Sequence, residues 1–461
     1  MIAETESIYQ IFLRNFTEEG TFRAAIPALQ RIANMGFTWV YLTPIHPIGK
    51  AARKGTLGSP YAIANYREIN PELGTLDDWS AFVEAAHAAG LRVMIDVVYN
   101  HTSPDSVLAR EHPEWFLKDA EGNLARKCAD WSDVVDLDYA ASPHLWMELI
   151  DTLQYWRDQG ADGFRCDVAS LVPADFWRQA RQRVNRYDPG RRAEQFPVVW
   201  LAESVHPSFL RYLRNRGFGA WSEPELHAAC FDLTYDYDGW ERLEAVWKGY
   251  RALADYHDYL YVQETLYPRG ARKIRYLENH DQKRAAARLG RKGLRAWTAW
   301  YQFLPGVSFA YMGQEYALHH TPSLFEREPI TTEQPDMEFA GFFARCLKVT
   351  REVKALAPYS TAMMLGPSTV LLARAAKPMP SSQHIAAEDL AAGDYLLIAN
   401  LAEGLPVQSG NVSGMGRSGD ESGLPFAVQG QDLLAGEPVT LRKGSRLDPG
   451  AVVLLEVRSI L

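Results

Sequence analysis

Short apolar runs alternate with longer amphipathic segments along roughly the first 350 residues of the chain. The longer segments repeat apolar residues at helical spacing, whereas the runs have the length of strands. This alternation predicts parallel strands joined by crossover helices, and eight such units predict an α/β protein with a (β/α)8 TIM barrel. The predicted strands are 7–13, 37–45, 91–101, 160–170, 197–204, 230–236, 273–278 and 307–313.

Two of the helical segments have recognisable ends. Segment 21–36 stops at Gly36, and glycine favours the C-terminal end of a helix. Segment 75–90 follows Thr75, a residue suited to the N-cap, with Asp78 three positions further on.

From about residue 358 the pattern changes to short apolar runs separated by turn residues, with no helical segment between them. This pattern predicts a small C-terminal antiparallel β-sandwich, and the Gly/Ser-rich stretch 409–423 is predicted to be a loop. The predicted strands here are 368–375, 394–401, 425–431 and 450–457.

These patterns predict two domains. A barrel is expected at 1–357, with a short insertion after its third strand at about 102–136. The β-sandwich is expected at 358–461.

The composition and charge of the chain argue against several classes of protein. The formal net charge of −9 argues against a nucleic-acid partner, because binding to phosphates depends on basic patches. No apolar run approaches the roughly 20 residues needed to span a bilayer, and no signal peptide is recognisable. The four cysteines are scattered without a CxxC pair, which predicts free thiols and a cytoplasmic location.

Polar residues gather where four of the predicted strands end. Arg165 and Asp167 share one face of an extended segment, so they form either a structural ion pair or part of a catalytic site. Carboxylates at neighbouring strand ends suit glycosidic cleavage, which needs a proton donor for the leaving oxygen and a carboxylate to meet the oxocarbenium-like centre. The strand-end residues are Asp96, Asn100, His101, Arg165, Asp167, Glu203, Asn279, His280 and Asp281.

Taken together, several stretches resemble the α-amylase family, glycoside hydrolase family 13. DVVYNH, GFRCDVAS, LAESVH and ENHD are similar to its four signature regions, and GFTWVYLTPI, VDLDY and GVSFAYMGQE to its secondary conserved stretches. The set occurs in order and covers essentially the whole chain. The segment HPIGKAARKGTLGSPYAIANYREINPELGTL is most similar to compact bacterial and archaeal members.

The resemblance implies a role for each strand-end residue. Asp167 would be the nucleophile, Glu203 the general acid/base and Asp281 the stabiliser of the transition state. Arg165 would keep Asp167 ionised, braced by Asp96. The residues expected to bind the sugar are Tyr61, His101, Arg165, Asn279 and His280, with Asp96 and Asn100 in support.

Other interpretations of single residues stay open. His101 is alternatively a core histidine and Tyr61 a loop-packing residue. Glu223 is a competing acid that does not end a predicted strand, and Glu315 is expected to be structural. Three tryptophans are either platforms for further sugars or packing residues: Trp115, Trp131 and Trp221.

Two departures from the family pattern affect metal and acceptor binding. Many amylases follow the nucleophile with a Lys-His pair, but this chain has Ser170 and Leu171 there. The short insertion offers oxygen ligands without a recognisable calcium loop, so no cofactor and no metal are expected even though Asn100 is present. The acids of the insertion are Asp105, Asp119, Asp130 and Asp133.

The resemblance therefore implies a retaining hydrolase of α-1,4 bonds in maltooligosaccharides, dextrins or starch-like glucans. The alternatives are an α-glucan transglycosylase, a cyclodextrin- or neopullulanase-type specificity, and a non-catalytic glucan-binding barrel. The expected partner is an α-glucan, with neither a nucleic acid nor a membrane. The oligomeric state stays open.

Overall fold

The structure is a computed structural model that describes residues 2–186, 197–380, 384–406 and 423–461. Its first part is a closed barrel of eight parallel strands, as predicted, in the order β1-β10-β9-β8-β7-β6-β3-β2. The barrel closes because β1 pairs with both β10 and β2. The strands are β1 (Ser7–Ile11), β2 (Trp39–Leu42), β3 (Arg92–Val97), β6 (Gly163–Cys166), β7 (Val199–Ala202), β8 (Leu233–Thr234), β9 (Arg272–Arg275) and β10 (Val307–Tyr311).

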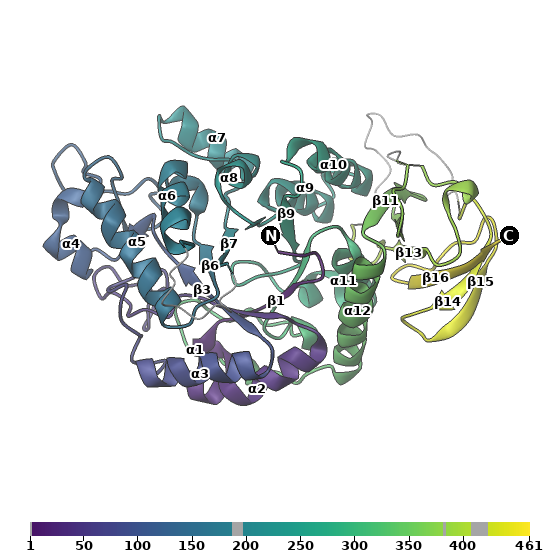
Figure 1. Ribbon diagram of the computed structural model, residues 1–461, viewed down its shortest axis with the longest axis horizontal. Coiled ribbons are helices and arrows are strands. Elements are labelled where there is room, and N and C mark those ends of the chain that lie inside the picture. Colours follow the sequence, from purple (N-terminus) through teal and green to yellow (C-terminus); the bar gives the residue numbers. More distant parts are fainter. Residues whose placement is uncertain (1, 187–196, 381–383, 407–422) are drawn as a thin grey trace.

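Helices cover the outside of the barrel (Figure 1). The expected helix ends are confirmed: Gly36 ends α2 with φ 109°, and Thr75 and Asp78 form a capping box at the start of α3. The α-helices of the described residues are α1 (Leu13–Phe16), α2 (Phe22–Met35), α3 (Leu76–Ala88), α4 (Val107–Glu111), α5 (Pro143–Asp158), α6 (Ala174–Val184), α7 (Pro207–Asn215), α8 (Glu223–Ala229), α9 (Tyr237–Trp247), α10 (Leu253–Leu266), α11 (Ala285–Phe303) and α12 (Met337–Leu356).

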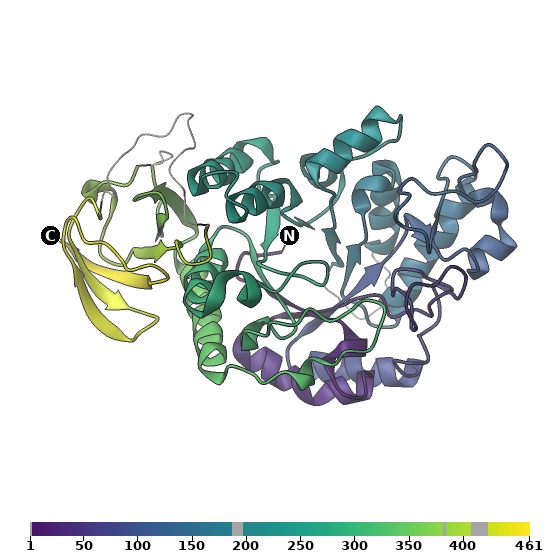
Figure 2. The same ribbon diagram turned by 180° about the vertical axis from the view of Figure 1, so that it is seen from behind.

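The insertion after β3 begins and ends with short strands that pair with each other in antiparallel orientation. β4 (His101–Thr102) pairs with β5 (Val135–Asp136), so that His101 lies opposite Asp136. The chain between them carries α4 and lies at the end of the molecule opposite the C-terminal sheet (Figures 1 and 2).

The C-terminal part is antiparallel, as predicted, and its described strands form one continuous six-stranded sheet in the order β11-β12-β13-β16-β14-β15. The expected boundary at 357/358 falls between the end of α12 and the start of this sheet. The expected loop 409–423 lies, except for its last residue, outside the described residues. The strands are β11 (Tyr359–Met364), β12 (Thr369–Ala375), β13 (Tyr395–Asn400), β14 (Val428–Asp432), β15 (Glu437–Leu441) and β16 (Val452–Ile460).

One face of this sheet packs on the barrel. Alternate residues of β12 divide between two cores: Leu372 joins the barrel core, and Leu371 joins a core on the far face of the sheet. Trp297 of α11 donates its Nε1–H to the carbonyl of Leu401 at 3.2 Å. Arg374 is fully buried and donates to the carbonyl of Phe303, at the end of α11.

No helix of the described residues is long and apolar enough to cross a membrane.

Candidate active site

Acidic side chains converge at the carboxyl-terminal edge of the barrel, where barrel enzymes place their chemistry. Asp96 on β3 lies opposite Arg165 on β6 in the strand register. Asp167 directly follows β6, and Glu203 directly follows β7. Asp281 lies in the loop between β9 and α11. The structure therefore brings the predicted acids to one edge.

The Arg165 guanidinium is fully buried and contacts three carboxylates. Its Nη1 donates to Asp96 Oδ1 at 2.9 Å and to Asp167 Oδ1 at 2.8 Å. Its Nη2 lies 2.6 Å from Glu203 Oε1. Because guanidinium nitrogens lie in one rigid plane, these contacts fix Asp167 and Glu203 relative to each other.

The backbone directly after Asp167 is strained. Val168 has φ 35° and ψ 46°, a left-handed conformation that costs a β-branched residue on the order of 1–3 kcal/mol. In this conformation the Val168 N–H donates to Glu203 Oε2 at 2.8 Å. Arg165 and Val168 therefore each hold one oxygen of the Glu203 carboxylate.

Burial raises the pKa of both carboxyl groups. The pKa of Glu203 rises to about 7 through burial, with Arg165 opposing the shift and Asp281 adding to it. Burial also raises the pKa of Asp167 well above its ordinary value; the Glu203 charge adds to this shift, and Arg165 opposes it. Because the two groups repel each other when both are ionised, they lose their protons in two coupled steps. The state between these two steps is an acid beside a carboxylate, the combination that glycosidic cleavage through a covalent intermediate needs.

His280 links Asp281 to the barrel interior. Gln10 Nε2 donates to His280 Nδ1 at 2.7 Å, so Nε2 carries the ring proton. That Nε2 lies 2.6 Å from the Tyr61 hydroxyl and 3.2 Å from Asp281 Oδ2. The Tyr61 ring, expected beneath the sugar, stacks on His280 with centroids 5.4 Å apart. Its contact with a sugar stays a prediction.

His101 lies beside Asp167, with its Nε2 3.9 Å from Asp167 Oδ2. Arg165 and Asn279 were expected to bind the sugar, but both are fully buried. Asn279 Oδ1 accepts the Asp281 N–H at 2.9 Å. Both side chains hold acids of the site in place, and their direct contact with a sugar stays a prediction.

The three candidate platform tryptophans have different surroundings. Trp131 lies beside His101, with ring centroids 5.5 Å apart, and is therefore close to the site. Trp115 is buried and stacks on His112. Trp221 donates its backbone N–H to the Ser170 carbonyl at 2.8 Å.

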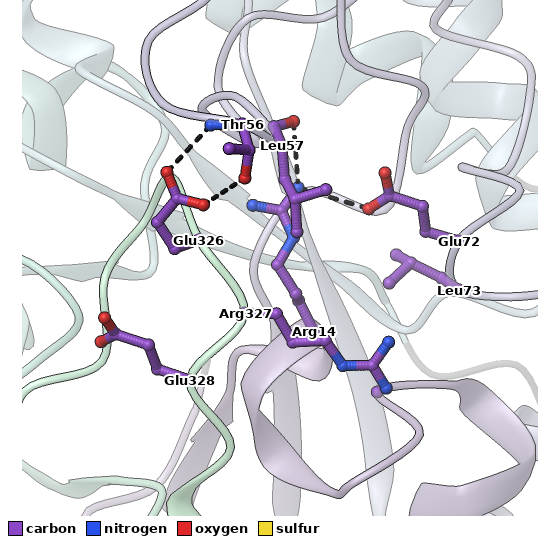
Figure 3. A pocket seen from close by; sticks show the side chains of 9 residues that line it. Arg14, Thr56, Leu57, Glu72, Leu73, Glu326, Arg327 and Glu328 are labelled. Atoms are coloured by element: carbon purple, nitrogen blue, oxygen red, sulfur yellow. Dashed lines mark hydrogen bonds and ion pairs between the residues drawn. The ribbon is translucent and has the colours of Figure 1, made fainter.

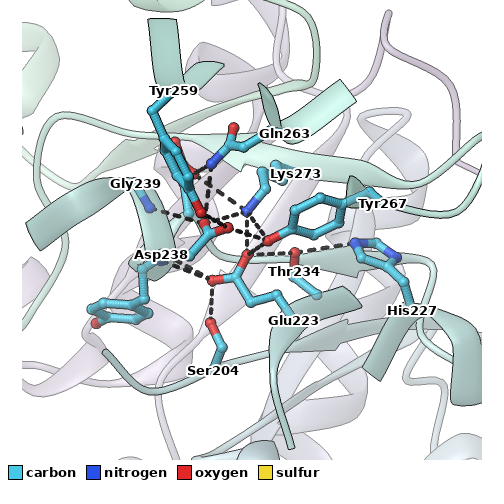
Figure 4. A network of polar contacts seen from close by, with 12 residues as sticks. Ser204, Glu223, His227, Thr234, Asp238, Gly239, Tyr259, Gln263, Tyr267 and Lys273 are labelled. Carbon is cyan, nitrogen blue, oxygen red and sulfur yellow. Dashed lines mark hydrogen bonds and ion pairs between the residues drawn. The ribbon is translucent and has the colours of Figure 1, made fainter. Parts of the chain in front are cut away.

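Glu223, the competing acid, lies in a buried polar network with Ser204, Asp238 and Lys273 (Figure 4). It contacts the Lys273 ammonium and accepts hydrogen bonds from Ser204 Oγ and from the backbone N–H of Tyr237. Lys273 also lies 2.6 Å from Asp238 Oδ1. Burial raises the pKa of Glu223 to about 7, with Asp238 adding to the shift and Lys273 opposing it. A raised pKa alone therefore does not distinguish Glu223 from Glu203, but their partners do.

Glu315 is also buried and accepts a hydrogen bond from the Tyr9 hydroxyl at 2.6 Å, which agrees with a structural role.

We expect Glu223→Gln to lower stability and leave acid catalysis in place. The change removes one anion from a buried, hydrogen-bonded network, which costs about 1–3 kcal/mol of unfolding free energy. Urea unfolding measures that loss, and a pH profile of kcat/KM measures the chemistry. If the fall of kcat/KM at alkaline pH disappears in Glu223→Gln, then Glu223 and not Glu203 is the proton donor.

The four acids of the insertion do not converge on a common point. Asp105 accepts from the backbone N–H groups of Lys50 and Ala51, and Asp119 accepts within its own turn. Asp133 lies 3.0 Å from Lys54 Nζ, which also donates to the Asp130 carbonyl. Across the described residues, no group of three or more His, Cys, Asp or Glu side chains is arranged to hold a metal ion.

A cavity of about 570 Å³ opens beside α1 (Figure 3). Its walls are polar but bonded to one another: Glu326 accepts the Thr56 N–H at 2.9 Å, and Arg14 donates to the Gly58 carbonyl at 3.0 Å. The predicted site residues do not line it, so it adds no candidate catalytic group. The described lining is Arg14, Gly20, Thr56, Leu57, Glu72, Leu73, Glu326, Arg327 and Glu328.

Several residues around the site were not predicted. Tyr41 donates to Asp96 Oδ2 at 2.6 Å, and the Tyr235 ring lies 5.5 Å from the Arg165 guanidinium carbon. Gln10 and Tyr41 lie within buried strands, where a polar group needs a partner. The sequence indicates this need for Gln10, which is the polar residue of an otherwise apolar run. Lys127, which contacts Asn100, lies in irregular chain and had no such signal.

A closed parallel barrel with carboxylates grouped at its carboxyl-terminal edge is typical of barrel enzymes whose chemistry uses paired carboxyl groups. The sequence model of the family "Alpha amylase, catalytic domain" matches residues 10–206 of this chain. A crystal structure of an alpha-amylase from Lactobacillus plantarum is 38% identical, with a TM-score of 0.83 and 98% of both chains covered. The noncanonic maltogenic alpha-amylase AmyB from Thermotoga neapolitana is 30% identical, with a TM-score of 0.77 and 99% of both chains covered. The chain therefore belongs to the α-amylase family, as the sequence motifs predicted.

Curated relatives carry a different name. An alpha-1,4-glucan:maltose-1-phosphate maltosyltransferase from Myxococcus xanthus is 35% identical in an alignment of 236 residues that covers 46% of this chain and 34% of that protein. The same name belongs to a Mycolicibacterium smegmatis protein that is 35% identical in an alignment of 244 residues that covers 47% of this chain and 34% of that protein. The matches thus span about a third of the length of these relatives.

Proposed function

We propose that the protein is a retaining glycoside hydrolase that cleaves α-1,4-glucosidic bonds in maltooligosaccharides, dextrins or starch-like glucans. The observation that carries this proposal is the single guanidinium of Arg165, which contacts Asp167 and Glu203 together. Two carboxyl groups held this close suit a double displacement, in which one is the nucleophile and the other carries a proton.

In the first step the Asp167 carboxylate attacks the anomeric carbon and the bond to the leaving oxygen breaks. The Glu203 proton passes to that oxygen, which leaves Glu203 ionised and a glycosyl ester on Asp167. In the second step Glu203 takes a proton from water, the water oxygen bonds to the anomeric carbon, and Asp167 leaves as a carboxylate. Two inversions at the same carbon retain its configuration.

The other residues serve this chemistry. Asp281 is the most open of the three acids, with its side chain 38% exposed, and stabilises the positive charge of the transition state. Tyr61, His101 and His280 bind the sugar that is cleaved. Asp96, Asn100, Arg165 and Asn279 hold these groups in position.

The second candidate function is transfer of a glucosyl or maltosyl unit to another sugar. It is favoured by the names of the curated relatives, which are maltosyltransferases. Both functions use the same glycosyl ester and differ only in whether water or a sugar hydroxyl opens it. The hydrolase takes precedence here because the amylase structures match nearly the whole chain. A cyclodextrin- or neopullulanase-type specificity uses the same residues.

A time course with maltoheptaose tests the proposal, with products separated by chain length and Asp167→Asn as the matched control. We expect only products shorter than the substrate, and none from the control. Products longer than the substrate would favour the transferase. No products from either sample, across a panel of α-glucosides, would favour a glucan-binding barrel without activity.

A further inference from the structure

Lys127 is a buried lysine of the insertion that the proposed mechanism does not use. Its residue is 8% exposed, and its Nζ donates to Asn100 Oδ1 at 2.7 Å. The same Nζ lies 3.6 Å from Asp136 Oδ2, which also accepts the Lys127 backbone N–H at 3.0 Å. Asn100 and Asp136 are fully buried. The ammonium therefore connects the chain that leaves β3 with the strand that returns from the insertion.

The contact with Lys127 fixes which way the Asn100 amide points. An ammonium only donates hydrogen bonds, so the oxygen of Asn100 must face it and the NH2 group must face away. That NH2 group lies 3.0 Å from His101 Nδ1 and donates to it. With Nδ1 accepting, a neutral His101 carries its proton on Nε2, the atom that faces Asp167. One buried charge thus sets the tautomer of a ring at the site.

The family resemblance implies a calcium ion near Asn100, but the residues present do not fit one. Calcium takes about six to eight oxygen ligands. Here Asn100 Oδ1 already accepts from an ammonium, and the insertion acids Asp105, Asp119 and Asp133 are engaged elsewhere. Asp136 Oδ1 is a buried oxygen without a hydrogen-bond partner among the described residues. A divalent cation beside it would lie against the positive charge of Lys127.

We propose that the Lys127 ammonium takes the place of a bound metal ion, orienting Asn100 and thereby holding His101 with its Nε2–H directed into the site. Lys127 is a positioning residue, because it acts through Asn100 and His101. The inference rests on the proposed function only in that His101 faces the sugar. The tautomer of His101 and the response to calcium are properties of the free protein.

The first test compares Lys127→Met with Lys54→Met. Methionine keeps most of the side-chain length without the charge. Lys54 is the matched control, because its ammonium also contacts the insertion, at Asp133 and the Asp130 carbonyl, but not Asn100. We expect kcat/KM to fall roughly tenfold or more in Lys127→Met, as for lost partners of ring nitrogens at metal sites, and to stay near wild type in Lys54→Met. Equal kcat/KM in both variants, measured well below their melting temperatures, would overturn the proposal.

The second test reads the His101 ring directly, without substrate. Long-range ¹H–¹⁵N spectra of histidine-labelled protein separate protonated from unprotonated ring nitrogens, and His101→Gln identifies the signal. We expect Nε2–H in the wild type and a mixture of tautomers in Lys127→Met. A wild-type ring protonated on Nδ1 would overturn the proposal even if Lys127→Met did not fold.

The third test is the melting temperature of the wild type with EDTA and with millimolar calcium. The proposal expects neither to change it. A drop with EDTA, or a rise with calcium, would mean that a metal ion occupies this site and that Lys127 does not replace it. Failure of the proposed function would appear instead as inactive wild type with the expected tautomer and the expected indifference to calcium.

Discussion

Asp167→Asn should abolish turnover of α-glucans while leaving the protein folded. The amide keeps the shape of the carboxylate, but it cannot form the glycosyl ester on which the proposed mechanism depends. We expect kcat to fall on the order of 10³-fold or more, about 4 kcal/mol in the barrier. Initial rates on maltoheptaose measure the loss, and circular dichroism checks the fold.

Asp162→Asn is the matched control for this experiment. Asp162 immediately precedes the same strand, β6, where it accepts the Val93 N–H at 2.8 Å and contacts His87 at 2.8 Å. It lies at the end of the strand opposite Asp167, so its loss should leave kcat near wild type. A folded Asp167→Asn variant that keeps more than a few per cent of wild-type turnover would refute the assignment of the nucleophile.

Glu203→Gln should show the second-largest effect, and its size should depend on the leaving group. The glutamine cannot protonate the leaving oxygen, so cleavage of maltoheptaose should slow by about 10²- to 10⁴-fold. A nitrophenyl glycoside needs little protonation, so formation of the glycosyl ester should be much less affected. A burst of nitrophenol followed by slow turnover would indicate that the second step, which needs Glu203 as a base, has become limiting.

The pH dependence gives an independent check on Glu203. Burial raises its pKa to about 7, and only the protonated form donates to the leaving oxygen. The wild-type kcat/KM should therefore fall as the pH rises through about 7. This alkaline limb should vanish in Glu203→Gln and persist in Glu223→Gln, whose acid is equally buried but lies outside the Arg165 cluster. An alkaline limb that persists in Glu203→Gln would contradict the assignment.

The sequence predicted the barrel because each buried strand is a compact apolar run and each run ends in polar residues. It also predicted that Arg165 and Asp167 share a face, since that follows from the two-residue period of a strand. It could not predict that the same guanidinium reaches Glu203, because that contact depends on which strands are neighbours and on how far each extends.

Most of the features that the sequence did not predict lie in irregular segments or in edge strands. Lys127 lies in a segment without periodicity, so nothing local indicates that it is buried. β15 was overlooked because Pro438 interrupts an otherwise weak pattern, yet proline is tolerated there because β15 is the edge of its sheet. In the sequence, only the position of Glu203 at the end of a predicted strand distinguishes it from Glu223. In the structure their partners differ, because Arg165 contacts Glu203 and Lys273 contacts Glu223.

The packing of α11 and α12 against the C-terminal sheet has a thermodynamic consequence. Barrel helices ordinarily turn their outer side to water, but here Leu372 and Leu397 of the sheet belong to the same apolar core as the helices. Arg374 reaches from the sheet to the carbonyl end of α11. Residues beyond 357 thus complete part of the packing around the barrel, so we expect the two parts to unfold together in a single melting transition.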